Sequence, residues 1–130
     1  MPGMPAAKMG DKVVGLCTHI IMNPSPGGPV PTPTPHPFMG IINGNLSPTV
    51  KIMGQAAATL GSTAANTPAH IPIGAGPFQI PPRNQATITV CSSTVMINNK
   101  PAARTGDSAM LCSDIPMLGN VIAVGTVMVG

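Results

Sequence analysis

The chain has 130 residues, a length that fits one domain with a modest hydrophobic core. Hydrophobic residues make up 43% of the chain and charged residues only 7%, whereas disordered chains show the opposite balance. The net charge of +3 comes from six scattered basic residues, and Phe38 and Phe78 are the only aromatic residues apart from the histidines. Nucleic-acid binders cluster basic residues and interleave stacking aromatics, so the composition argues against a nucleic-acid partner.

The sequence also indicates the cellular compartment in which the protein is made. The N-terminal stretch lacks the apolar segment of a secretory signal, and the longest apolar run, near residues 121–129, is too short to span a bilayer. We therefore expect synthesis and assembly in the cytoplasm, where thiols stay reduced. Three cysteines are an odd number, which speaks against a disulfide framework. A core of mostly small side chains needs another source of stability, and a metal ion is one candidate.

In chain order, the first predicted element is residues 5–11, Pro-Ala-Ala-Lys-Met-Gly-Asp. A proline-rich insertion follows at about residues 24–37, which we expect to form a stiff loop around His36. Asn43-Gly44 then offers the residue types of a two-residue hairpin turn.

Two complete copies of one motif come next, at residues 47–62 and 92–107. Both read Thr-Val-x-Ile, a two-residue turn, then x-x-Ala-Ala-x-x-Gly. The alternating, β-branched half favours a strand, and the turn residues Met53-Gly54 and Asn98-Asn99 tolerate positive φ. Each copy is therefore predicted to be a β-hairpin that ends at Gly-Ser or Gly-Asp, where a short polar side chain can bond the backbone.

A third copy is split between the two ends of the chain. Residues 126–130 match residues 94–98, and residues 5–11 match residues 101–107. This split predicts that the last strand returns beside the first segment to close a threefold arrangement. Helices are not expected, because the chain has no Glu and few stretches longer than ten residues lack Gly or Pro.

The repeats resemble those of PAAR-repeat proteins. Pro101-Ala102-Ala103-Arg104 is the signature of that family, and residues 5–8 and 55–58 look like variants of it. The resemblance implies an all-β, single-domain cone over residues 1–130 with pseudo-threefold symmetry and no fused effector domain. The sequence departs from the pattern at Ala58-Thr59 and at Ser62, which leaves the Arg and Asp roles of that copy in question.

Two of the three histidines follow their repeats at the same distance, and His36 lies in the proline-rich insertion. His19 and His70 each lie eight residues after a repeat end, at Asp11 and Ser62, and Cys112 lies five residues after the third, at Asp107. In a threefold arrangement these loops converge, and imidazole and thiolate donors suit tetrahedral zinc.

The resemblance implies one structural zinc ion per chain, held by His19, His36, His70 and Cys112. Cys17 is an alternative to Cys112 as the thiolate ligand, whereas Cys91 is expected to be a small buried hydrophobic residue.

Catalysis is not expected. A hydrolytic zinc site needs an open position and usually a carboxylate base, and the only carboxylate near the predicted ligands is Asp114. We expect Asp114 to cap a loop or face solvent. The sequence contains neither a nucleophile elbow nor a phosphate-binding loop.

The function implied by the resemblance is that of a structural tip. Such a tip caps and sharpens the trimeric VgrG-type spike of a type VI secretion or related contractile injection system, one cone per trimer. It carries effector cargo in some relatives, touches the target membrane mechanically, and leaves the cell with the apparatus. The alternatives are a free zinc-binding effector, such as a small hydrolase, or an adaptor delivered by such a machine.

Overall fold

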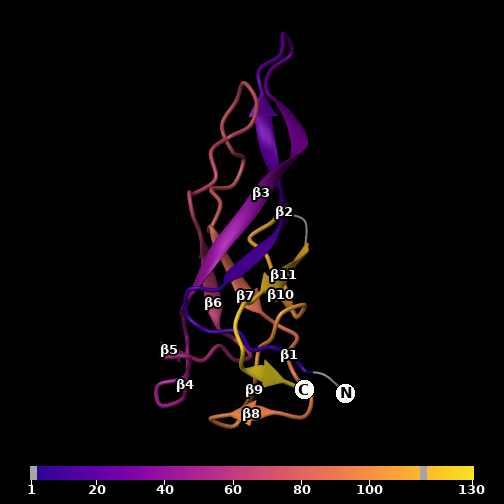
Figure 1. Ribbon diagram of the computed structural model, residues 1–130. Helices are drawn as coiled ribbons and strands as arrows, with labels where there is room; N and C mark the ends of the chain where they lie inside the picture. Colours follow the sequence, from indigo (N-terminus) through magenta and orange to yellow (C-terminus); the bar gives the residue numbers. More distant parts are fainter. Residues whose placement is uncertain (1–2, 115–116) are drawn as a thin grey trace.

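The computed structural model describes residues 3–114 and 117–130 (Figure 1). Within these two ranges all the elements of regular secondary structure are β-strands. The described residues therefore contain no helix long and apolar enough to cross a membrane. The strands form one closed antiparallel barrel and three two-stranded sheets. Figure 1 shows an elongated molecule with the small sheets and both termini at one end and the β2–β3 hairpin reaching out at the other. The prediction of an all-β fold is confirmed.

The three small sheets are the three sequence repeats. Their pairs are β4 (Lys51–Ile52) with β5 (Gln55–Ala56), β8 (Met96–Ile97) with β9 (Lys100–Pro101), and β1 (Met4–Pro5) with β12 (Met128–Val129). Both complete copies turn through two residues of positive φ, 51° and 83° at Met53-Gly54 and 52° and 65° at Asn98-Asn99. These values are those of a two-residue hairpin turn, as the sequence predicted.

The split copy closes across the chain ends. Met4 pairs with Val129 and Pro5 with Met128, so the first and last strands make one antiparallel sheet. The prediction that the C-terminal strand returns beside the N-terminal segment is confirmed.

A ring of main-chain hydrogen bonds joins the three repeats. The backbone N–H of Ala7 donates to Ala103, that of Ala103 to Ala58, and that of Ala58 to Ala7, at N···O distances of 3.0, 3.1 and 3.0 Å. Each of these alanines is almost completely buried, so no larger side chain fits between the strands. Three isolated β-bridges follow the same cycle: Lys8 with Ala57, Thr59 with Ala102, and Ala6 with Arg104.

Each repeat ends in the same turn, although one copy has different side chains. The glycine has a φ of 95°, 89° or 87° (Gly10, Gly61 and Gly106), a conformation that glycine adopts without strain. The next side chain accepts a hydrogen bond from the backbone N–H three residues earlier. Asp107 accepts from Arg104 at 2.8 Å, and Ser62 accepts from Thr59 at 2.9 Å. Ser62 therefore performs the backbone role of the aspartate in the divergent copy, without an ion pair.

The barrel consists of three hairpins, each of which starts directly after a repeat. These are β2 (Lys12–Asn23) with β3 (Val30–Gly44), β6 (Thr63–Asn66) with β7 (Gln85–Ile88), and β10 (Ser108–Met110) with β11 (Leu118–Ile122). Neighbouring hairpins pair along their edges, and the pairing of β11 with β2 completes the closed barrel. Small buried residues fill the main core together with Phe38, Ile42, Ile88 and Val121, and a second cluster around Ile52 and Val129 lies under the small sheets.

Two local predictions were wrong. The proline-rich insertion is not a loop beyond its turn, because residues 30–37 belong to strand β3. Its prolines occupy every second position, so their exposed rings share one face while Thr34, His36 and Phe38 face inward. Asn43-Gly44 is also not a hairpin turn. It ends β3, and the positive φ falls on Asn45, at 51°.

Candidate metal centre

The candidate donors lie on the three barrel hairpins. Cys17 and His19 are two residues apart on β2, so both side chains point to the same, inner face. His36 is the β3 partner of Cys17 in the strand register. His70 lies on the connection from β6 to β7, and Cys112 on the connection from β10 to β11. Residues far apart in sequence thus meet because each hairpin extends from an equivalent repeat.

Four of these side chains form a compact group. One donor atom from each of Cys17, His19, His70 and Cys112 lies within 4.8 Å of the other three. The Cys17 and Cys112 sulfurs are 3.4 Å apart, and the Cys112 sulfur is 3.7 Å from His19 Nε2. The structure therefore brings together three of the four predicted ligands, His19, His70 and Cys112, and adds Cys17.

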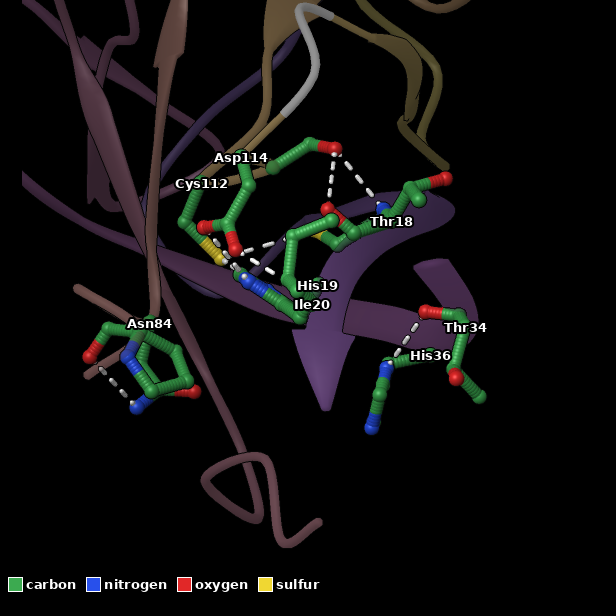
Figure 2. A network of polar contacts seen from close by, with 11 residues as sticks. Thr18, His19, Ile20, Thr34, His36, Asn84, Cys112 and Asp114 are labelled. Carbon is green, nitrogen blue, oxygen red and sulfur yellow. Dashed lines mark hydrogen bonds and ion pairs between the residues drawn. The ribbon is translucent and has the colours of Figure 1, made fainter. Parts of the chain in front are cut away.

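His36 borders this group without belonging to it. Its Nδ1 donates to the Thr34 carbonyl oxygen at 2.9 Å (Figure 2). Its Nε2 accepts from the backbone N–H of Ile73 at 3.2 Å. Its ring centroid is 5.5 Å from that of His19 and 5.6 Å from that of His70. The His36 ring therefore lies beside the group, with both of its nitrogens in hydrogen bonds to the backbone.

Asp114 orients His19, a role that the sequence did not predict. Its carboxylate accepts from His19 Nδ1 at 3.1 Å and from the backbone N–H of Ile20 at 2.9 Å (Figure 2). This contact places the Nδ1 proton on the Asp114 side and directs the Nε2 lone pair toward Cys112. Metal-ligating histidines commonly have such a carboxylate partner. In the sequence, only the position of Asp114 two residues after Cys112 indicated that it could lie near the donors.

The connection that carries His70 is fixed by a different contact. Asn84 Oδ1 accepts the backbone N–H of His70 at 2.8 Å and the side-chain amide of Asn66 at 3.3 Å. The half-buried ring of Phe78 lies against the rings of His19 and His36, with centroids 5.5 and 5.3 Å away. The Phe78 ring therefore covers His19 and His36 on one side.

The two thiols have opposite electrostatic environments. The hydrogen bond with Cys112, together with burial, raises the pKa of Cys17, which therefore remains a thiol. The same hydrogen bond, donated by Cys17, lowers the pKa of Cys112 and favours its thiolate. Burial lowers the pKa of His70, so its imidazole remains neutral and keeps a free lone pair. A neutral imidazole beside a thiolate is the form in which both groups bind metal.

The donor chemistry fits zinc. Cys and His are the usual zinc ligands, with bonds of about 2.0–2.3 Å. Three imidazoles bound to one tetrahedral ion have ring centroids roughly 5 Å apart. The centroids of His19, His36 and His70 are 5.0 to 5.6 Å apart. In addition, His70 Nε2 is buried and has no hydrogen-bond partner, a cost that an ion in the group would remove.

A cavity of about 400 Å³ leads to this group from the surface. His36 and His70 line it together with mostly apolar residues, among them Ile71 and Ile73. It gives solvent, and hence an ion, a route to the buried donors.

Comparison with known protein families supports the repeat analysis. The model of the PAAR motif family matches residues 22–110, which is more than half of the chain and includes both complete repeats. The chain belongs to the PAAR motif family. This is the spike-tip family of type VI secretion, and it is structural rather than catalytic. A comparison with curated proteins gives no significant match.

The matched range includes His36 and His70 but not Cys17, His19 or Cys112. The family match therefore does not cover all of the proposed donors, and the predicted ligand set of His19, His36, His70 and Cys112 stays a prediction.

Proposed function

We propose that this PAAR protein is the structural tip of a contractile injection system, of the type VI secretion kind or the extracellular phage-tail kind. It acts as a single pseudo-threefold cone whose base caps one trimeric VgrG-type spike. The observation that carries this proposal is the cyclic hydrogen bonding of Ala7, Ala58 and Ala103, which relates three equivalent hairpins within one chain. One chain with three similar faces can match three identical subunits.

The proposed docking surface is the end that carries the small sheets. Each small sheet or its turn carries an exposed methionine, and the split copy carries two: Met4, Met53, Met96 and Met128. Methionine is flexible and polarizable, which suits an apolar interface that must fit three subunits at once. Exposed apolar side chains gathered in this way are typical of a protein interface.

The proposed metal is one structural zinc ion per chain. We place His19, His70 and Cys112 as ligands, with His36 as the fourth, and Cys17 as a thiol that donates to the Cys112 sulfur. Bound zinc would supply cross-links among the three barrel hairpins and no reaction. Asp114 keeps His19 in the ligating tautomer, and Phe78 excludes water.

Stiffness gives the tip its proposed mechanical role. Strands β2 and β3 pair over twelve residues from Lys12↔Ile41 to Asn23↔Val30, so the end opposite the termini is a continuous hairpin. We propose that this end meets the target membrane when the apparatus contracts. The protein would be made in the cytoplasm and leave the cell with the spike and any attached effector.

Binding of the spike trimer tests this proposal. We expect the candidate spike, immobilised as a trimer, to retain the wild-type chain. A double variant, Met53→Asp with Met96→Asp, should reduce retention at least tenfold because it places charge in two of the three proposed contacts. Met110→Asp is the matched control, since Met110 is similarly exposed on barrel strand β10. The proposal would be contradicted if the spike retained the wild type, the double variant and the control equally, or retained none of them.

A further inference from the structure

Cys17 and Cys112 are two buried free thiols that face each other, a pair that the proposed docking role does not use. Their sulfurs are 3.4 Å apart although 95 residues separate them in the sequence. A disulfide bond is about 2.0 Å long, so the sulfurs need to approach by only about 1.4 Å.

The backbone beside the pair is held in place. Next to Cys17, the Thr18 N–H donates to Ser113 Oγ at 2.7 Å, and the Thr18 carbonyl accepts from the N–H of Asp114 at 2.9 Å. These bonds dock the segment after Cys112 against β2, so the two sulfurs face each other within a fixed frame. Closure then requires only small side-chain rotations.

We propose that Cys17 and Cys112 form a redox-sensitive dithiol, which a small hydroperoxide converts to a disulfide when no metal ion is bound. The Cys112 sulfur attacks one oxygen of hydrogen peroxide, the O–O bond breaks, and a sulfenic acid and water form. The Cys17 sulfur then attacks the sulfenyl sulfur, and the hydroxyl group leaves with the Cys17 proton as a second water. Two thiols lose two electrons, and one peroxide gains them.

Burial selects the oxidant. Cys17 is fully buried and Cys112 is 4% exposed, so Cys112 reacts first and a bulky disulfide reagent is excluded. Hydrogen peroxide is small and uncharged, so it can reach the Cys112 sulfur. Cys91 has a separate environment in which burial raises the pKa of its thiol to about 12, and it has no sulfur partner among the hydrogen bonds of the described residues.

If zinc binds as proposed above, the disulfide and the metal exclude each other. A Cys112 sulfur bound to zinc donates electron density to the ion and is therefore a weaker nucleophile toward peroxide, and a disulfide sulfur is not a zinc ligand. Both states connect β2 to the segment after β10, so oxidation after metal loss preserves the cross-link at that junction.

The test counts free thiols in the full chain. Chelator-treated protein is incubated with or without hydrogen peroxide, denatured, alkylated and weighed by mass spectrometry. We expect the number of alkylated cysteines to fall from three to one, with peptide mapping locating the bond at Cys17 and Cys112. Cys91→Ala is the control and should fall from two to none. Three alkylated cysteines after peroxide, or a disulfide that contains Cys91, would overturn the proposal.

A zinc-loaded sample separates this inference from the proposed function. We expect bound zinc to slow disulfide formation at least tenfold. Equal rates with and without zinc would refute the protection and the role of Cys112 as a ligand, while the dithiol itself would stand. Since the assay uses the chain without a spike, its result does not depend on docking.

Discussion

The two ends of the molecule are built in different ways from the same three units. At the end with the termini, the repeats are nearly interchangeable, because main-chain hydrogen bonds between Ala7, Ala58 and Ala103 hold them together. At the barrel, the three hairpins differ in length, and each contributes different side chains to the metal centre. Backbone contacts thus preserve symmetry under sequence change, whereas side-chain contacts allow each unit to take a separate task.

The largest expected effect comes from removing a donor at the asymmetric end. His19→Ala should abolish zinc binding and lower the free energy of unfolding, measured in zinc-containing buffer, by about 4 kcal/mol when zinc exceeds its Kd a thousandfold. Metal analysis and urea unfolding measure both effects. Cys91→Ala is the control and should keep one zinc ion per chain. Equal losses in the two variants would show that His19 is not a ligand.

Two further variants sharpen the assignment of the fourth ligand. His36→Ala should lose zinc as His19→Ala does, whereas Cys17→Ala should retain it with weakened affinity. The reverse result, with zinc lost only in Cys17→Ala, would assign Cys17 as the ligand instead of His36.

Acidification should weaken the same end. Burial lowers the pKa of His70 from 6.5, so the unfolded chain takes up the proton first as the pH falls. The stability that neutral His70 contributes is therefore complete above about pH 6.5 and declines below it. The lowered pKa of Cys112 acts in the same direction. We expect zinc release and a lower melting temperature between pH 7 and pH 5, and retention of zinc at pH 5 would contradict the ligand set.

A smaller effect is expected at the symmetric end. Ala58→Leu inserts a large side chain into the fully buried alanine ring and should lower the free energy of unfolding by about 1–3 kcal/mol. Ala69→Leu makes the same change at an exposed site and should stay within about 0.5 kcal/mol of the wild type. Chemical unfolding measures both values. Similar losses in the two variants would mean that the ring is not tightly packed.

The smallest effect on stability is expected at the outer edge of β3. On β2, the N–H groups of Thr18, Ile20 and Met22 point away from β3 and bond to other segments. Their partners on β3 are prolines, and in such a non-hydrogen-bonded pair the backbone nitrogen and carbonyl of the partner also point away, toward the outer edge of β3. Because proline has no N–H, this edge offers carbonyl groups alone and cannot pair fully with another strand.

Pro33→Ala with Pro35→Ala restores two donors on that edge. We expect a change of less than about 1 kcal/mol in the free energy of unfolding but concentration-dependent self-association, measured by light scattering. Pro26→Ala with Pro29→Ala, in the segment that connects β2 to β3, is the matched control. A double variant that stays monomeric at high concentration would show that proline is not what blocks the edge.

The symmetric end could be predicted from the sequence because its information is local. Turn residues and alternating β-branched residues define each hairpin, and the split copy implies that the chain ends meet. The divergent copy was harder, since only the structure shows that Ser62 accepts the backbone bond that Asp107 accepts elsewhere.

The metal centre was predicted in part. Equal spacing after the repeats indicated His19 and His70, and a shorter spacing after the remaining repeat indicated Cys112. The proximity of Cys17 to Cys112 depends instead on which strands become neighbours. The placement of His36 on a strand was missed because proline usually signals a loop. The regular alternation from Pro31 to Pro37 was the overlooked sign of an edge strand.

The most direct test of the central claim is the stoichiometry of the complex with the spike. Purified chain is mixed in excess with the candidate VgrG-type trimer, and the complex is weighed by light scattering after size exclusion. If one polypeptide presents three equivalent faces, one chain should bind per three spike subunits however large the excess. Three chains per trimer, or no complex at all, would contradict the account.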